Sequence, residues 1–369
     1  MIEIKIDIGK DDKMKGYSLE DDKITFIFDK NLYQGKQLDD DIIIKEVALN
    51  ASFTAWKNLW NLEKITDDLW VLNKKINEVD IPGNSGQGEF RFVINDKYYL
   101  DAPAEVPLKD KFYDGHSGGY KHIIHLDKSK TNKIKKINSQ IEEYKTNYNS
   151  DKELANFRSV NLGSLGEGVL YRSYHPLKES RADHPLEEKR LMLTQELIAN
   201  NKINSIINLS DTDESIFNKF PYYKELILNN NTIFTNKGYN YDVFYYIAGS
   251  EEFANLVRRI ANFILADNNK APFLVHCRIG TDRTGVIVAI LAALMGASWK
   301  DIVKDYQASN NMGISEYRDE KLLEYAFIAM LGSKFKDNLS KLMEDYFKNK
   351  LDLKDNQLNK IKNKLSGKL

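Results

Sequence analysis

Hydrophobic residues occur in two different spacings along the chain, and the change from one to the other divides the sequence. Up to about residue 126 they form short runs or alternate with polar residues, and Asp, Asn, Gly and Pro separate the runs, which is typical of short antiparallel strands. The runs lie at 24–28, 42–44, 47–49, 70–72, 90–94 and 123–124. This spacing predicts an all-β sandwich in residues 1–126.

The pattern changes after residue 126. Residues 127–155 are polar and contain a basic run at 128–136. They predict a linker whose charges lie in solvent. The sequence therefore divides into a front domain, this linker and a following domain of residues 156–369.

Within residues 156–369, short apolar runs alternate with segments of helical spacing such as 186–199 and 251–265. The alternation predicts an α/β domain with a central, mostly parallel sheet. Amphipathic spacing between 339 and 365 predicts C-terminal helices that pack onto this domain.

Composition narrows the class of protein. The chain has 369 residues, of which 42% are hydrophobic, and a net charge of −1, which is ordinary for a globular protein and gives no argument for nucleic-acid binding. Its one cysteine cannot form an internal disulfide, as is usual in a reducing compartment. The N-terminus is charged and unlike a signal peptide, and no apolar run reaches the roughly 20 residues of a membrane helix. We therefore expect a cytoplasmic protein that does not insert stably into membranes.

One stretch combines a buried strand, a short loop and a buried helix, and it holds the cysteine. Apolar residues at 273–275 predict the strand and those at 286–295 the helix. Free N–H groups at a helix start, with the positive end of the helix dipole, form a binding site for an anion. We therefore predict that the loop binds phosphate through Arg278, Ile279, Gly280, Thr281, Asp282 and Arg283.

Side chains of this loop suggest how it reacts. Arg283 offers a planar fork that matches two phosphate oxygens, and the positive surroundings favour the thiolate form of Cys277, ready for nucleophilic attack. Gly280 permits a backbone conformation that other residues resist. We expect Thr284 to donate its hydroxyl to the sulfur and His276 to fix the loop from behind.

The string from His276 to Gly285 resembles the His-Cys-x5-Arg-Ser/Thr loop of the cysteine-dependent protein tyrosine phosphatase superfamily. Asn-Phe-Arg at 156–158 and Leu-Tyr-Arg-Ser at 170–173 resemble a bacterial branch that joins tyrosine and dual-specificity phosphatases with phosphoinositide-active relatives, although the opening is altered after Arg158. The resemblance implies an α/β phosphatase domain and two displacements through a phosphocysteine. It requires neither a metal nor a cofactor, and we expect none.

The leaving group of such a reaction takes a proton from a general acid. Superfamily members often supply an Asp a few tens of residues before the cysteine, which favours Asp242 here. Asp282, inside the loop, is the alternative that the bacterial branch suggests. Asp211 and Asp213 are the remaining candidates.

The front domain has a resemblance of its own. Residues 47–56, the later strand at 90–94 and Tyr98 resemble the immunoglobulin-like glycogen- and starch-binding modules. The resemblance implies that Trp56 and Tyr98 form a platform for a sugar ring and that Arg91 is a polar contact. The terminal ligand-contacting segment of those modules is not kept. The alternative interpretation is that Trp56 is a core residue of a docking or dimerisation domain.

These observations leave several functions open. The leading hypothesis is a metal-independent phosphatase that acts on phosphotyrosine proteins or with dual specificity. Inositol phosphates, phosphoinositides and phosphorylated glucan are alternative substrates. The hypothesis from another class is a scaffold that only binds phosphorylated ligands or carbohydrate.

Overall fold

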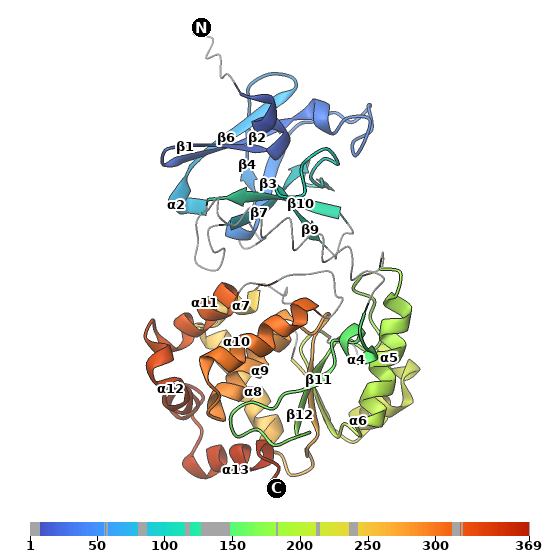
Figure 1. Cartoon of the computed structure of the whole chain (residues 1–369), viewed down its shortest axis with the longest axis vertical. Helices are drawn as coiled ribbons and strands as arrows, with labels where there is room; N and C mark the ends of the chain where they lie inside the picture. The colour runs from blue at the N-terminus through green and yellow to red at the C-terminus, as the bar shows by residue number, and fades with distance from the viewer. Residues whose placement is uncertain are drawn as a thin grey trace. The chain divides into compact units, whose positions relative to one another are not determined.

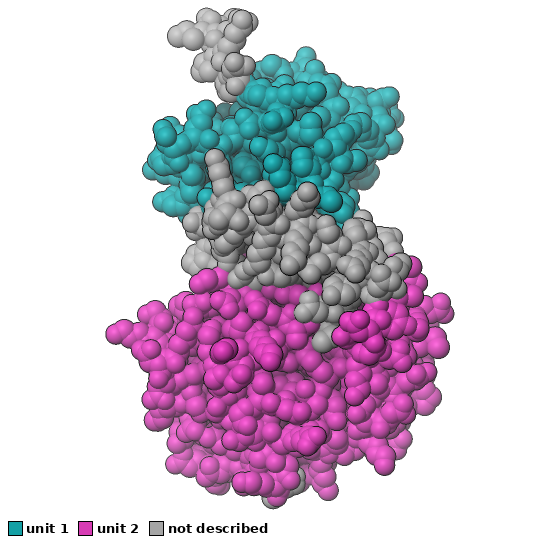
Figure 2. Space-filling model, in the orientation of Figure 1, with its two compact units in different colours: residues 1–142 teal, residues 143–369 magenta. Residues whose placement is uncertain are grey.

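The computed structural model describes residues 8–54, 56, 58–79, 87–114, 119–126, 148–181, 184–211, 215–235, 243–311, 318 and 320–368. The chain divides into two compact units, residues 1–142 and 143–369 (Figure 2). The second unit includes helix α4 (Asp151–Leu154), which precedes the start at residue 156 that the sequence suggested. None of the described helices is both long and apolar enough to cross a membrane.

Two antiparallel sheets build the first unit (Figure 1). One has the order β1-β2-β6-β5, and the other has the order β4-β3-β7-β10-β9 with β8 paired to β7. The strands are β1 (Tyr17–Glu20), β2 (Lys23–Asp29), β3 (Val47–Ala51), β4 (Trp60–Asn61), β5 (Glu63–Lys64), β6 (Leu69–Lys75), β7 (Gln87–Ile94), β8 (Tyr98–Tyr99), β9 (Lys111–Asp114) and β10 (Gly119–His125). Two short helices, α1 (Lys10–Lys15) and α2 (Ile76–Val79), accompany them.

The two sheets share one hydrophobic core. Alternate residues of β2 and β7 point into it, and Phe26, Phe28, Phe90 and Phe92 are fully or almost fully buried there. Successive side chains of a strand point to opposite faces, and residues on the other face, such as Ile27 and Val93, are fully buried as well.

The strand predicted at 42–44 is absent from the structure, so that prediction was wrong. The backbone there is irregular because the side chain of Asn95 satisfies it. Asn95 Oδ1 accepts from Lys45 N at 2.9 Å, and Asn95 Nδ2 donates to Ile43 O at 2.9 Å. These are the backbone groups that a neighbouring strand would otherwise pair.

The second unit is built around a five-stranded sheet of order β11-β12-β15-β13-β14. Strands β12, β15, β13 and β14 are parallel, and β11 is antiparallel to β12. The strands are β11 (Arg158–Ser159), β12 (Leu170–Ser173), β13 (Ser205–Asn208), β14 (Thr232–Phe234) and β15 (Phe273–His276). The predicted α/β architecture with a mostly parallel sheet is confirmed for this unit.

Helices cover both faces of this sheet (Figure 1). On one face lie α5 (Glu187–Asn200) and α6 (Pro221–Leu228), which pack against Leu274 of β15. The other face is covered by elements from the second half of the unit. These are α7 (Val243–Ile247), α8 (Glu251–Leu265), α9 (Asp282–Leu294), α10 (Trp299–Ala308), α11 (Glu320–Leu331), α12 (Leu339–Asp345), a π-helical segment (Tyr346–Lys350) and α13 (Asp355–Leu365).

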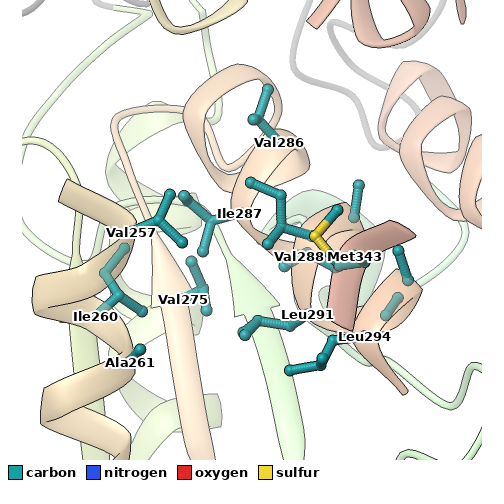
Figure 3. Close-up of a cluster of buried hydrophobic side chains, with 14 of the residues drawn as sticks. Val257, Ile260, Ala261, Val275, Val286, Ile287, Val288, Leu291, Leu294 and Met343 are labelled. Atoms are coloured by element: carbon teal, nitrogen blue, oxygen red, sulfur yellow. The ribbon is translucent and has the colours of Figure 1, made fainter. Parts of the chain in front are cut away.

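Helix α9 is the centre of the larger core. All of its residues are buried, so it has no solvent-facing side. Figure 3 shows its side chains between those of α8, Val275 of β15 and Met343 of α12. A helix held on every side gives the loop that precedes it a fixed base.

Candidate active site

Cys277 to Thr281 connect the carboxyl end of the central strand β15 to the start of α9, and donors from several elements hold their carbonyl groups. Cys277 O lies 3.2 Å from His276 Nδ1. The other four contacts are His175 N to Arg278 O at 3.0 Å, Asn156 Nδ2 to Ile279 O at 2.8 Å, Arg172 Nη2 to Gly280 O at 2.7 Å and Gly285 N to Thr281 O at 2.8 Å. Every carbonyl from Cys277 to Thr281 therefore faces a donor outside the loop.

The N–H groups of the same loop are in the opposite situation. Within the described part of the chain, the N–H groups of residues 278–281 donate to no acceptor. The buried hydroxyls of Thr281 and Thr284 likewise have no hydrogen-bond partner there. Leaving a buried polar group unpaired costs about 1–3 kcal/mol, so this concentration of free donors at the start of α9 favours a bound anion.

Gly280 allows the loop to turn back on the sheet. Its φ is +75°, in the left-handed region, and a Cβ at this position would lie 2.2 Å from Ser173 O. Both the backbone conformation and the close approach to β12 therefore exclude a larger residue.

Cys277 begins the loop and Arg283 lies in the first turn of α9, and both are buried. Arg283 Nη1 donates to Leu209 O at 2.7 Å, just beyond the end of β13. No hydrogen bond joins the Thr284 hydroxyl to the Cys277 sulfur among the contacts of these two residues. The expected Thr284 contact is thus not made in this structure, and its hydroxyl stays available as a donor.

Arg278 contributes differently from Arg283. Its Nε donates to Ser180 Oγ at 2.8 Å and its Nη2 donates to Glu179 O at 2.7 Å. The side chain therefore ties segment 179–180 to the loop, and only the peptide group of Arg278 belongs to the loop's free N–H set.

A chain of hydrogen bonds sets the tautomer of His276. Burial lowers the pKa of His276 to about 3, so the ring is neutral. Because Nδ1 donates to Cys277 O, Nε2 accepts from Tyr223 Oη at 2.8 Å, and Tyr223 Oη in turn accepts from Asn208 Nδ2 at 3.2 Å. Burial raises the pKa of Tyr223 well above its ordinary value, which keeps this phenol protonated.

Two arginines, the fully buried Arg172 and the half-buried Arg158, support the loop from the side of the sheet. Arg172 Nη1 and Arg158 Nε donate to Asp305, at 2.5 and 2.8 Å, and Arg158 Nη1 donates to Asn156 Oδ1 at 2.7 Å. Although burial would raise it, the charges of Arg172 and Arg158 hold the pKa of Asp305 below its usual range. Sequence reasoning cited these arginines only for a family resemblance. An arginine inside the buried strand β12 was the signal that this role existed.

Asp282 is the first residue of α9 and is almost fully buried. Its Oδ1 accepts from Arg318 Nε at 2.6 Å and from Tyr245 Oη at 2.9 Å. Neither Arg318 nor Tyr245 was identified from the sequence, because no local pattern links residues so far from the loop.

Asp211 lies beside the loop, two residues after the carbonyl that Arg283 contacts. His175 Nδ1 accepts from the N–H groups of Leu177 and Lys178, so His175 Nε2 carries the proton and donates to Asp211 Oδ2 at 2.7 Å. Lys178 Nζ donates to Asp211 Oδ1 at 2.6 Å. Burial opposes ionisation, but these contacts hold the pKa of Asp211 far below its usual range. Asp211 is therefore built as an anion.

The other candidate acids, Asp242 and Asp213, lie outside the described residues. Phe244, two residues after Asp242, is fully buried in the core around α9. Among the described residues, no three His, Cys, Asp or Glu side chains gather where they could hold a metal ion.

The residues considered for carbohydrate binding separate onto two faces of their sheet. Tyr98 pairs with Ile94 and packs against the inner core, whereas Tyr99 pairs with Val93 on the outer face and is 54% exposed. Arg91 belongs to the outer face and forms an ion pair with Asp101 at 3.0 Å. The expected platform of Trp56 with Tyr98 is therefore not formed, because successive residues of β8 point to opposite faces.

Trp56 has a positive φ of +56° and is half-buried. The ammonium of Lys121 lies 4.4 Å from the centre of its ring. Lys121 thus occupies one of the two faces on which a sugar would stack.

Comparison with known proteins identifies the class to which this strand, loop and helix belong. A family model described as the tyrosine phosphatase family matches residues 152–367, which is more than half of the chain. The chain therefore belongs to the tyrosine phosphatase family, and the expectation of a phosphatase is confirmed at that level.

The solved structures include a similar chain, the core catalytic domain of the PP-IP phosphatase SIW14 from S. cerevisiae in complex with citrate. The two chains are 19% identical, the likeness covers 45% of this chain and 86% of the other, and the TM-score is 0.27. A likeness this weak carries no inference about substrate. No curated protein matches the chain.

Proposed function

We propose that the chain is a metal-independent phosphatase that hydrolyses phosphomonoesters through a phosphocysteine at Cys277. The observation that carries the proposal is the division of the loop backbone. Its carbonyls are all bound by donors outside the loop, and the N–H groups of 278–281 face no acceptor among the described residues. That arrangement suits a trigonal phosphoryl group whose oxygens carry negative charge.

The reaction consists of two displacements. The Cys277 sulfur attacks phosphorus while the bond from phosphorus to the ester oxygen breaks, and the leaving alkoxide takes a proton from a general acid. Water then attacks the phosphocysteine and gives a proton back to the deprotonated general acid, the sulfur–phosphorus bond breaks, and inorganic phosphate and the thiolate are formed. Arg283 and the loop N–H groups hold the phosphoryl oxygens through both steps.

His276 and Thr284 support the same chemistry. His276 fixes the carbonyl of Cys277 and so the direction of the sulfur. The Thr284 hydroxyl, which has no partner among the described residues, donates to the thiolate when the sulfur leaves phosphorus in the second step.

We test the proposal by measuring phosphate release from a panel of substrates, with Cys277→Ser as the control. The panel holds a phosphotyrosine peptide, a phosphoserine peptide, inositol phosphates, phosphoinositides and phosphorylated amylopectin. We expect release by the natural chain and none by Cys277→Ser, and the preferred substrate identifies the class. Failure to release phosphate from any of them would leave a binding protein as the better description.

The general acid is tested separately with two aryl phosphates. An acid matters most for a poor leaving group, so replacing it should slow phenyl phosphate far more than p-nitrophenyl phosphate. We compare Asp242→Asn and Asp282→Asn in this assay. The variant with the larger ratio of losses identifies the proton donor.

Glucan binding by the first unit is a weaker proposal. Trp56 and Arg91 lie on the outer face, but Lys121 covers one side of the Trp56 ring. We expect little co-sedimentation of the intact chain with glycogen. Strong co-sedimentation that Trp56→Ala removes would restore the carbohydrate hypothesis.

A further inference from the structure

The phosphate loop ends at a negatively charged side chain, the carboxylate of Asp282. Asp282 is 1% exposed, and the carboxylate lies at the loop's end in the first turn of α9. A bound phosphate monoester carries up to two negative charges. A buried carboxylate beside it would repel it, because charges interact strongly where water is excluded.

Arg318 supplies the opposing charge. Its Nε lies 2.6 Å from Asp282 Oδ1 and its Nη2 lies 3.4 Å from Asp282 Oδ2. The Arg318 side chain is only 9% exposed, so the pair is held away from water and is little screened.

The position of Arg318 is fixed by its own backbone. Asn310, just after α10, accepts from Arg318 N through Oδ1 at 2.8 Å and donates to Arg318 O through Nδ2 at 3.0 Å. These two contacts fix the backbone of Arg318 and so the point from which its side chain extends towards Asp282.

Two phenols complete the surroundings of Asp282. Tyr245 Oη donates to Asp282 Oδ1 at 2.9 Å, and the hydroxyls of Tyr245 and Tyr306 are 2.6 Å apart. Since Tyr245 uses its proton on Asp282, Tyr306 donates to Tyr245. Burial raises the pKa of both phenols far above the ordinary value, so both remain donors. A Cβ on Gly285 would lie 2.6 Å from Tyr306 Cδ2, and this glycine therefore allows Tyr306 to reach its place.

We propose that Arg318 is a positioning residue of the phosphate loop and acts as the counter-ion of Asp282. By neutralising Asp282, it lets the loop accept a dianionic ester next to a buried carboxylate. It also holds Asp282 as a hydrogen-bond acceptor, which leaves the proton-donor role to another residue. The inference rests on the proposed function for its meaning in catalysis, but it makes a statement about anion binding that is measured without turnover.

The test compares phosphate binding by the full-length chain and three variants: Arg318→Gln, Asp282→Asn and the double variant with both changes. Titration calorimetry with inorganic phosphate measures the Kd, and thermal unfolding shows that each variant is folded. Arg318→Gln leaves Asp282 unneutralised, so we expect Kd to rise at least tenfold. The double variant removes both charges, and we expect its Kd to return to within about threefold of the natural chain.

Recovery in the double variant is the result that a merely structural role would not give. A double variant that binds as weakly as Arg318→Gln would overturn the proposal, as would an Arg318→Gln variant that binds normally. Should Arg318→Gln fail to fold, Arg318→Lys carries the test, since it keeps the charge but loses the fork and should bind better than a neutral Arg318→Met. If the natural chain bound inorganic phosphate but released no phosphate from any substrate, the proposed function would be refuted and the inference about Arg318 would stand.

Discussion

Replacing Arg172 tests whether this buried arginine holds the phosphate loop in place. Arg172 is fully buried, donates to Gly280 O at 2.7 Å and forms an ion pair with Asp305 at 2.5 Å. Arg172→Met keeps much of the volume but removes the charge and both contacts. Asp305 and Gly280 O are then left with fewer hydrogen-bond donors.

The magnitude follows from these contacts. Removing one partner of a buried ion pair costs about 3–5 kcal/mol. Because Arg158 still pairs with Asp305 at 2.8 Å, we expect the loss of this ion pair to cost the lower value of that range. The unpaired Gly280 carbonyl adds roughly 1 kcal/mol. A loss of about 4 kcal/mol lowers the Tm of a domain of this size by about 8–16 °C.

The assay is differential scanning calorimetry of the full chain, in which the second unit is identified by its stabilisation with phosphate. Arg259→Met is the matched control: Arg259 is exposed and also donates to a backbone carbonyl, Phe234 O, at 3.0 Å. We expect the control to cost less than about 1 kcal/mol. If Arg172→Met lowered the Tm no more than the control, the reasoning about the buried network would be refuted.

Two further predictions use other parts of the chain. Gly280→Ala should reduce phosphate release at least a hundredfold, because the methyl group would lie 2.2 Å from Ser173 O. Gly332→Ala is the control for backbone strain alone, since Gly332 has a similar φ of +88° and a Cβ there would meet nothing within 4 Å. Equal activity of the two variants would contradict the clash. In the first unit, burial lowers the pKa of His122 from 6.5 to about 3, so the unfolded chain binds its proton first and stability is lost as pH falls below 6.5. Between pH 6.5 and 5 the free energy of unfolding falls by about 2 kcal/mol for this reason. Urea unfolding of His122→Gln should therefore show a free energy of unfolding that depends less steeply on pH. An unchanged pH dependence would exclude His122 as the cause of the loss.

Elements with a strong local pattern were predictable from the sequence. Helix α8 was expected at 251–265 and is observed over Glu251–Leu265, because its apolar residues recur at helical spacing and Ser250 caps its start. The loop from Cys277 to Arg283 was located for a similar reason, since all its residues are contiguous between two apolar runs.

What depends on distant contacts was not predictable. Arg318 and Tyr245 contact Asp282, and Tyr306 contacts Tyr245. These residues come from three separate segments, and no spacing in the sequence links them. The face on which Tyr98 lies is likewise set by the pairing of β8 with β7. The register of β8 on β7 follows from the turn between the two strands, and the sequence motif that includes Tyr98 does not determine it.

The burial of α9 on all sides has a consequence for redesign and for divergence within the family. A loop whose carbonyls are all fixed and whose helix touches only protein cannot reshape itself around a new substrate without losing its anion site. Changes of preference have to come from the residues around it. Segment 177–179 is such a place, because Lys178 is 41% exposed at its side chain yet is held 2.6 Å from Asp211 beside the loop. A library confined to that segment would vary recognition while the chemistry stays constant.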